Sequence, residues 1–146
     1  MRKILLACAL ALVLPFLAIA GPKEDAFQVL EQFKKAFDAS DMQTVVSLFA
    51  PDALFLPTTN PRLLTTTKEF DDYFQPLKRL APLSMKIDSS SAIVLSDSAV
   101  LFTGMDTFGL TRDGKAVEVP ARFTILVAKG DRGWRISHFH SSARPG

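Results

Sequence analysis

Two histidines near the carboxyl end of the chain are the residues best suited to proton transfer near neutral pH. His138 and His140 stand two positions apart in a predicted β-strand, so their side chains are expected on one face of it, together with Trp134 and Ile136. At the wall of an apolar cavity, such imidazoles exchange protons with a bound molecule. A histidine on an apolar face is also commonly a core residue hydrogen-bonded to backbone, and both interpretations are open here.

Two acidic residues are further candidates for this chemistry. Asp52 follows a proline at the start of a short predicted strand, where its carboxylate either caps the turn or lies at the mouth of a cavity. Asp106 lies inside a predicted strand, on the outer face or at a bulge, and is a weaker candidate for a base. The catalytic residues expected from this pattern are His140, His138 and Asp52.

Aromatic and branched side chains are expected to form the wall of the cavity. In residues 117–127 the odd-numbered positions are all apolar, which places them on the face that the helices cover. The single tyrosine of the sequence, Tyr73, lies in a predicted helix and can donate a hydrogen bond into a cavity. The ligand-binding residues expected from this pattern are Tyr73, Phe123, Ile125 and Trp134.

Helices that precede these strands are predicted from apolar spacing and from caps. Apolar residues recur with the helical period over residues 23–39. Ser40 with Gln43, and Thr66 with Glu69, have the spacing of a capping box. The sequence therefore predicts one long helix, a short second helix that ends near residue 49, and a third helix that carries Tyr73.

Strands are predicted between and after these helices. A short strand is expected over residues 53–56, and from residue 84 onward the apolar period changes to two. Further strand candidates are residues 85–87, 92–95, 99–110, 117–129 and 134–141. Turn sequences separate the later candidates, so neighbouring strands are expected to pair antiparallel. The predicted fold class is α+β, with helices packed on one face of a curved, mostly antiparallel sheet.

The composition indicates one globular domain that does not bind nucleic acid. The chain has 146 residues, of which 48% are hydrophobic and 22% charged. Its 17 Lys and Arg residues include Arg2 and Lys3, and without these two they equal the 15 Asp and Glu residues in number. A near-neutral chain without a basic stripe lacks the charge that nucleic-acid binding requires.

Motifs for other kinds of site are missing from the sequence. No Gly-rich turn of the dinucleotide or P-loop type occurs, and no Gly-x-Ser-x-Gly elbow accompanies Ser141 or Ser142. A metal site on His138 and His140 would need further ligands, and the single cysteine, Cys8, lies near the amino terminus. We therefore expect no metal and no cofactor.

The first twenty residues have the pattern of a secretory signal peptide. A basic start precedes an apolar run over residues 4–17, and the small residues Ala18 and Ala20 follow it. Cleavage after Ala20 would leave one domain, residues 21–146, in the periplasm or outside the cell. An uncleaved anchor and a lipidated Cys8 are the alternatives, but the apolar run is shorter than a membrane span of about 20 residues.

The carboxyl-terminal strands resemble the closing strands of the nuclear-transport-factor-2-like superfamily, and the similarity extends over the whole mature chain. The nearest branches are the SnoaL-like proteins and the association domain of calcium/calmodulin-dependent kinase II. The motifs that carry the resemblance are Arg122-Phe123-Thr124-Ile125-Leu126-Val127, Trp134-Arg135-Ile136 and His138-Phe139-His140-Ser141-Ser142. The resemblance implies a cone-shaped fold, with N-terminal helices on a strongly curved sheet, a pocket in the cone, and dimers formed through the sheet.

The same resemblance implies two different functions. The superfamily includes isomerases, dehydratases and cyclases, as well as non-catalytic assembly modules. The kinase association domains carry arginines in the pocket, whereas this chain is expected to have Phe123, Ile125 and Val127 there. An apolar ligand therefore fits better than an anionic one.

We expect an exported protein that binds a small apolar or aromatic molecule, with an isomerase or dehydratase type of reaction on an apolar carbonyl or aromatic compound. The alternative is a non-catalytic dimerisation or assembly module of the association-domain type. In both cases the chain has no nucleic-acid partner and, after signal cleavage, no membrane partner.

A homodimer is expected through the outer face of the sheet, the face away from the helices. Phe139 and Leu126 are predicted on this face. Large apolar side chains on an outward face are unfavourable unless a partner covers them.

Export is predicted to remove residues 1–20, because their basic, apolar and small-residue regions follow the order of a cleavable signal. Mass spectrometry of the protein from its native host should find a chain that begins at Gly21. Detection of an intact Met1 or of a lipidated Cys8 would contradict this expectation.

Overall fold

The computed structural model describes residues 21–145 as three α-helices, one 3₁₀-helix and five β-strands. The predicted signal peptide, residues 1–20, lies outside the described residues. In chain order the elements are α1 Pro22–Asp38, α2 Met42–Ser47, β1 Phe49–Leu56, α3 Thr67–Phe74, the 3₁₀-helix η1 Gln75–Leu80, β2 Ser84–Ser96, β3 Ala99–Arg112, β4 Lys115–Gly130 and β5 Gly133–Ala143.

Local signals in the sequence explain where α1 and α3 begin. α1 starts at Pro22, whose fixed φ suits the first turn, and the acidic Glu24 and Asp25 favour the positive end of the helix dipole. α3 follows Thr66, and the predicted capping box between Thr66 and Glu69 is formed. Both helices therefore lie close to their predicted positions.

The predicted cap of α2 is wrong by one residue. The side chain of Asp41, not of Ser40, accepts a hydrogen bond of 3.1 Å from the backbone N–H of Thr44. Ser40 has a φ of 56°, in the left-handed region, because it forms the turn between α1 and α2. A residue with that backbone conformation does not serve as an N-cap, whose dihedrals are normally extended.

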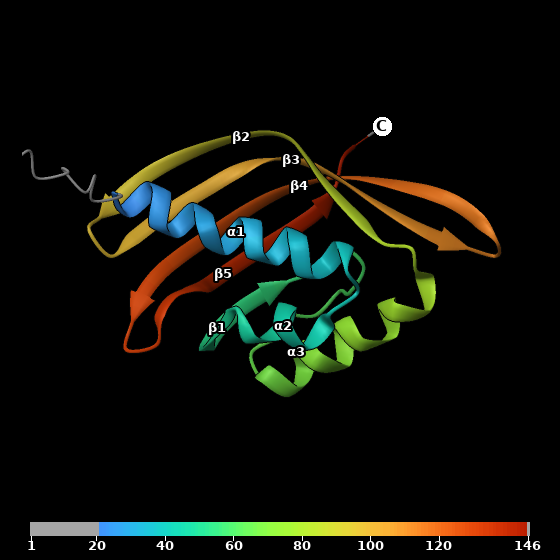
Figure 1. The fold of residues 1–146 in the computed structure, drawn as a ribbon, viewed down its shortest axis with the longest axis horizontal. Helices are drawn as coiled ribbons and strands as arrows, with labels where there is room; N and C mark the ends of the chain where they lie inside the picture. The colour runs from blue at the N-terminus through green and yellow to red at the C-terminus, as the bar shows by residue number, and fades with distance from the viewer. Residues whose placement is uncertain (1–20, 146) are drawn as a thin grey trace, which may run out of the picture.

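The five strands form one open sheet in the order β1-β5-β4-β3-β2. The helices lie on one face of the curved sheet, and the tip of the β3–β4 hairpin projects beyond them (Figure 1). The predicted α+β fold is therefore confirmed, as is the antiparallel pairing of β2 to β5 along the chain. Two features were not predicted: β1 already begins at Phe49, and it pairs parallel with β5.

The helix-covered face, here called the inner face, carries the odd-numbered residues of β4 as predicted. Ala121, Phe123, Ile125 and Val127 are buried there, whereas Arg122 is exposed on the opposite, outer face. Their regular alternation follows from the uninterrupted pairing of β4 with β3.

In β5 a β-bulge reverses the predicted alternation. Val127 pairs with Ile136, but the next residue of β4, Leu126, pairs with His138, so Ser137 has no partner on β4. After this extra residue the side chains that were expected outside turn inward. The placement of His138 and His140 beside Ile136 is therefore wrong.

Phe139 is the clearest result of the bulge, because it belongs to the core rather than to the outer face. Its ring centroid lies 5.2 Å from that of Phe55 and 5.7 Å from that of Phe33, and Phe139 is 2% exposed. Phe49 and Phe74 belong to the same aromatic cluster. The predicted dimer surface therefore loses Phe139 and keeps Leu126.

Replacement of Phe139 by alanine should lower the free energy of unfolding by about 3–5 kcal/mol, because it opens a cavity among packed rings. Urea unfolding measures this loss. Leu126→Asp is the matched outer-face variant: it should retain the folded state and separate the predicted dimer, as light scattering at micromolar concentration would show. A stable Phe139→Ala protein would contradict the placement of Phe139, and a Leu126→Asp protein with unchanged mass would contradict the dimer surface.

Candidate functional site

A cavity of about 230 Å³ lies between the inner face of the sheet and the helices α1, α3 and η1. Its wall is mainly aromatic and aliphatic, and the exposed Arg112 is its charged residue. The lining residues are Phe33, Phe37, Phe55, Thr58, Thr59, Tyr73, Phe74, Leu77, Leu80, Leu83, Phe108, Leu110, Arg112, Val119, Phe139 and Ser141. Such a wall binds apolar molecules and leaves their orientation to a few polar groups.

Hydroxyl groups form one polar corner of this cavity. The hydroxyls of Thr58 and Ser141 are hydrogen-bonded at 2.5 Å, and those of Thr59 and Tyr73 lie 3.3 Å apart. Burial raises the pKa of the Tyr73 phenol, so it remains a hydrogen-bond donor at neutral pH. Ser141 reaches this corner because the bulge in β5 turns it inward, where it is 4% exposed.

Asp106 lies on the inner face of β3, one side-chain position along the strand from the cavity, and is not itself a lining residue. The next inner-face residue of β3 is Phe108, and Phe108 and its β4 partner Val119 both line the cavity. Asp106 is 0% exposed, and within residues 21–145 neither of its carboxyl oxygens has a hydrogen-bond partner. Burial raises the pKa of this carboxyl to about 6.

Arg144 fixes the backbone behind Asp106. Its Nη2 donates a hydrogen bond of 2.7 Å to the backbone oxygen of Asp106, and its Nε donates one of 2.9 Å to the backbone oxygen of Ala121. It also forms an ion pair with Asp88, which, with Thr107 and Lys86, lowers the pKa of Asp88 to about 2. The positive charge of Arg144 lowers the pKa of Asp106, but burial has the larger, opposite effect.

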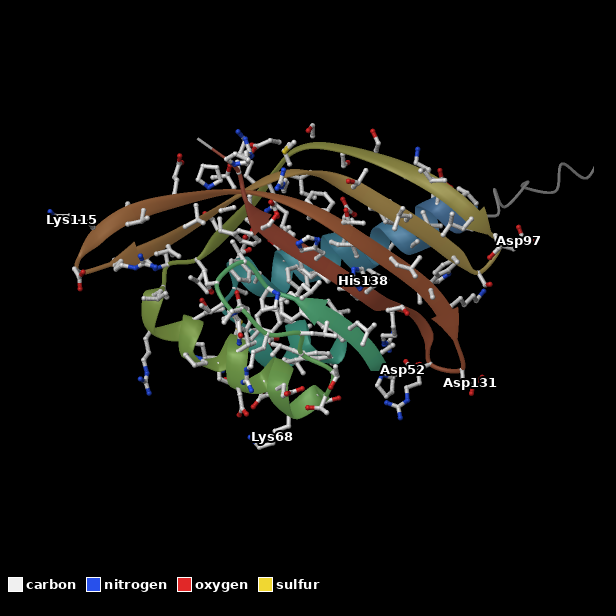
Figure 2. All side chains as sticks on the ribbon, turned by 180° about the vertical axis from the view of Figure 1, so that it is seen from behind. Asp52, Lys68, Asp97, Lys115, Asp131 and His138 are labelled. Atoms are coloured by element: carbon white, nitrogen blue, oxygen red, sulfur yellow. The ribbon has the colours of Figure 1, made fainter. Side chains whose placement is uncertain are left out.

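The three predicted catalytic residues lie outside the cavity lining. His138 is half-buried and His140 exposed, because the bulge turns both to the outer face. Burial, followed by the nearby His140, lowers the pKa of His138. Figure 2 shows His138 near the middle of the sheet and Asp52 toward the end of the sheet that carries Asp131; Asp52 is exposed. The prediction that His140 lines the inner cavity is therefore wrong.

Of the four predicted ligand-binding residues, only Tyr73 lines the inner cavity. Phe123 and Ile125 face inward as expected, but they are packed in the core. Trp134 is half-buried against that core near the start of β5, and no hydrogen-bond partner for its buried indole N–H lies within residues 21–145. The cavity is lined by the later part of β5, which carries Phe139 and Ser141, and not by the part that carries Trp134.

Residues 21–145 contain no group of three or more His, Cys, Asp or Glu side chains placed to hold a metal ion. None of their helices has both the length and the apolar character needed to cross a membrane.

Helices on one face of a curved, mostly antiparallel sheet, with a cavity between them, define the α+β nuclear-transport-factor-2-like, cystatin-like fold. Residues 27–145 match the family model of the SnoaL-like domain. The chain therefore belongs to the SnoaL-like family. A search of curated protein sequences finds no match.

Solved structures support the same assignment. A protein from Xanthomonas campestris, named for the association domain of calcium/calmodulin-dependent protein kinase II, is 27% identical, with a TM-score of 0.77 over 87% of this chain and 94% of its own. A protein from Streptomyces avermitilis, named as a dehydratase of the NTF2-like family, is 15% identical, with a TM-score of 0.75 over 86% and 98%. A ketosteroid isomerase-like protein from Erwinia carotovora is 12% identical, with a TM-score of 0.69 over 84% and 95%. At the lower two identities the similarity concerns the fold alone.

Asp106 should make stability fall as pH rises from 4 to 7. Its folded-state pKa of about 6 lies above the ordinary value of 3.8, so the folded protein holds this proton more tightly than the unfolded chain. The stabilisation is complete below pH 3.8 and is lost as pH rises through 6. The full shift corresponds to about 3 kcal/mol, of which about 2 kcal/mol is lost between pH 4 and 7.

Urea unfolding of Asp106→Asn from pH 4 to 7 tests this expectation, since the amide does not titrate. The free energy of unfolding of the variant, relative to the parent, should rise across this range. Asp97→Asn is the control: Asp97 is exposed in the β2–β3 turn and is not among the groups that shift the pKa of Asp106, so the removal of its charge should leave the slope in place. If the free energy of unfolding changed with pH in the same way for the parent and for Asp106→Asn, the pKa of the buried carboxyl would not be raised in the folded protein.

Proposed function

We propose that this chain, after export, binds a small, mainly apolar compound with a carbonyl or phenolic oxygen in the inner cavity and transfers a proton on it. The observation that carries the proposal is the buried carboxyl of Asp106, which has no hydrogen-bond partner among the described residues and lies next to the cavity-lining Phe108 on the inner face of β3. Strongly perturbed acids in such places are characteristic of catalytic sites.

The cavity limits the size and polarity of the ligand. An apolar cavity of about 150 Å³ holds benzene, so about 230 Å³ suits a molecule of one or two small rings. Rings from α1, α3 and the sheet would surround its apolar part. The polar corner of Tyr73, Thr59, Thr58 and Ser141 would hold its oxygen atom, with Tyr73 as a hydrogen-bond donor.

Asp106 has a suitable pKa for a general base. With a pKa of about 6, it is mostly ionised at pH 7 yet remains basic enough to accept a proton from carbon next to a carbonyl. A donor such as Tyr73 would stabilise the negative charge that then develops on the carbonyl oxygen. This division of roles corresponds to an isomerase or dehydratase type of reaction, as the names of two structural neighbours suggest.

Assembly into a homodimer is the second proposed property, and it needs no catalysis. Strand register aligns an outer-face row of side chains, largely apolar, across the whole sheet. The members of this row are Ile93, Leu101, Leu126, His138 and Leu54. Ile93 is 55% exposed and Leu54 42%, which favours a covering partner. The Leu126→Asp variant described above tests this surface.

Thermal-shift screening of the mature chain with small aromatic and cyclic carbonyl compounds tests the cavity. A compound that binds only the folded state should raise the melting temperature by several degrees at about 100 times its Kd. Tyr73→Phe should weaken binding by about tenfold, because it removes one buried hydrogen bond. Asp106→Asn should retain binding and lose exchange of the acidic carbon-bound hydrogen of the ligand with deuterium, as measured by NMR.

His140→Gln is the matched control for this experiment, because the imidazole lies on the outer face. It should leave both binding and exchange unchanged. Binding that depends on His140 but not on Tyr73 would contradict the cavity as the site. Exchange that persists in Asp106→Asn would remove Asp106 from the reaction.

A further inference from the structure

Among residues 21–145, Arg112 is the one charged residue that lines the inner cavity, and it is the last residue of β3. Phe108 and Leu110, the two inner-face residues that precede it, also line the cavity. Both of these are half-buried, whereas Arg112 is exposed. Arg112 therefore lies where the cavity wall meets solvent, a place here called the cavity mouth.

The turn between β3 and β4 holds Arg112 on the inner face. Asp113 and Gly114 form this turn, and their φ values of 51° and 71° are both positive, as they are at the centre of a type I′ turn. The pairing of the two strands is regular up to the turn, where Arg112 pairs with Lys115. Because a two-residue turn fixes the register of its hairpin, the position of Arg112 at the cavity mouth is built into the backbone.

The charge of Arg112 is not balanced by an ion pair within residues 21–145. No carboxylate lines the cavity, and Asp113, the next residue in the chain, forms no ion pair there either. The partner of Arg112 across the hairpin is another cation, Lys115, which lies at the hairpin tip (Figure 2). Like charges in directly opposite positions repel. The guanidinium of Arg112 is therefore available to an anion from outside the chain.

The cavity restricts such an anion to a mainly apolar molecule with its charge at one end. Aromatic and aliphatic walls cannot replace the hydration of a carboxylate. A carboxylate deep in the cavity would also approach the carboxyl of Asp106, which lies beyond Phe108 along β3. At the mouth a carboxylate remains in contact with water and meets a guanidinium whose paired N–H donors match its two oxygens.

We propose that the ligand of the inner cavity is a small apolar acid, such as an arylalkanoate, whose carboxylate binds Arg112 at the cavity mouth. This inference rests on the binding proposed above and adds the charge and the orientation of the ligand. Its phenolic or carbonyl oxygen would reach the polar corner that contains Tyr73 and Ser141. Strand register places the two ends apart: Ser141 pairs with Phe123 in the middle of β4, whereas Arg112 lies at the hairpin end of the β3–β4 pair.

Two matched probes test this inference on the mature chain: para-hydroxyphenylacetate and its neutral amide, para-hydroxyphenylacetamide. They share the ring and the phenol and differ in the charge of the other end. NMR shifts of the methyl groups of Leu110 and Val119, which line the cavity, measure Kd at a constant ionic strength of about 0.15 M. The acid should bind about fivefold more tightly than the amide, because a charge-assisted hydrogen bond that is partly exposed to water adds modestly to affinity.

Two variants separate direct binding by Arg112 from a general effect of charge. Arg112→Gln should remove the preference for the acid and leave the Kd of the amide unchanged, which a loss of structure would not do. Lys115→Gln is the matched control, because it removes a positive charge from the same hairpin at a residue that does not line the cavity. It should keep the preference for the acid.

Equal binding of the acid and the amide to the parent chain would overturn the role of Arg112 while binding in the cavity stands. An equal loss of the preference in Arg112→Gln and Lys115→Gln would do the same. Binding of neither probe would also overturn this inference, and the thermal-shift screen described above then shows whether binding in the cavity fails with it.

Discussion

The bulge at Ser137 is the constraint on which the inner cavity depends. Without the extra residue, strict alternation would continue from Ile136 to His138 and His140, and Phe139 would face outward. The unpaired residue on β5 disrupts the ladder locally, but it lets Phe139 enter the aromatic cluster. Burial of one such ring stabilises the fold by roughly 1.5–3 kcal/mol, whereas two imidazoles buried among these rings would lose their hydration. Packing therefore favours the bulged register.

A second consequence of the core is the environment of Asp106. The carboxyl sits among side chains that cannot hydrogen-bond to it: Ile87 and Ala121 are its partners on the two neighbouring strands. Burial of an unpartnered polar group lowers stability, so ordinary packing does not explain its presence. Arg144 lies behind the same strand but donates to the backbone oxygen, which fixes the position of Asp106 and leaves its side-chain oxygens free within the described structure. This arrangement preserves a titratable group near neutral pH.

The sequence supports predictions where a signal is local. The helical period before Asp38, the Thr66–Glu69 capping box and the alternation in β4 each depend on neighbours within one element, and each is found in the structure. Which side chains of β5 face inward depends on its pairing with β4 and on the space for aromatic rings in the core. Neither can be read from a period-two pattern. The same holds for β1: its parallel pairing with the last strand joins residues far apart in the chain. For Asp106, the shared face with Phe102 and Phe108 is readable, but only the pairing of Phe102 with Ile125 identifies that face as the covered one.

The two faces of the sheet are chemically distinct because alternating residues of the same strands supply them. On β4, Phe123 and Ile125 belong to the core, whereas Arg122 and Thr124 lie on the outer face. The low dielectric of the inner side strengthens the effect of an unpaired carboxyl, and water on the outer side weakens that of an exposed guanidinium. Burial therefore raises the pKa of Asp106, the carboxyl on the inner face. Substitutions at even positions of β4 change the outer face and leave the ring packing intact, so the outer face and the inner cavity can be altered independently.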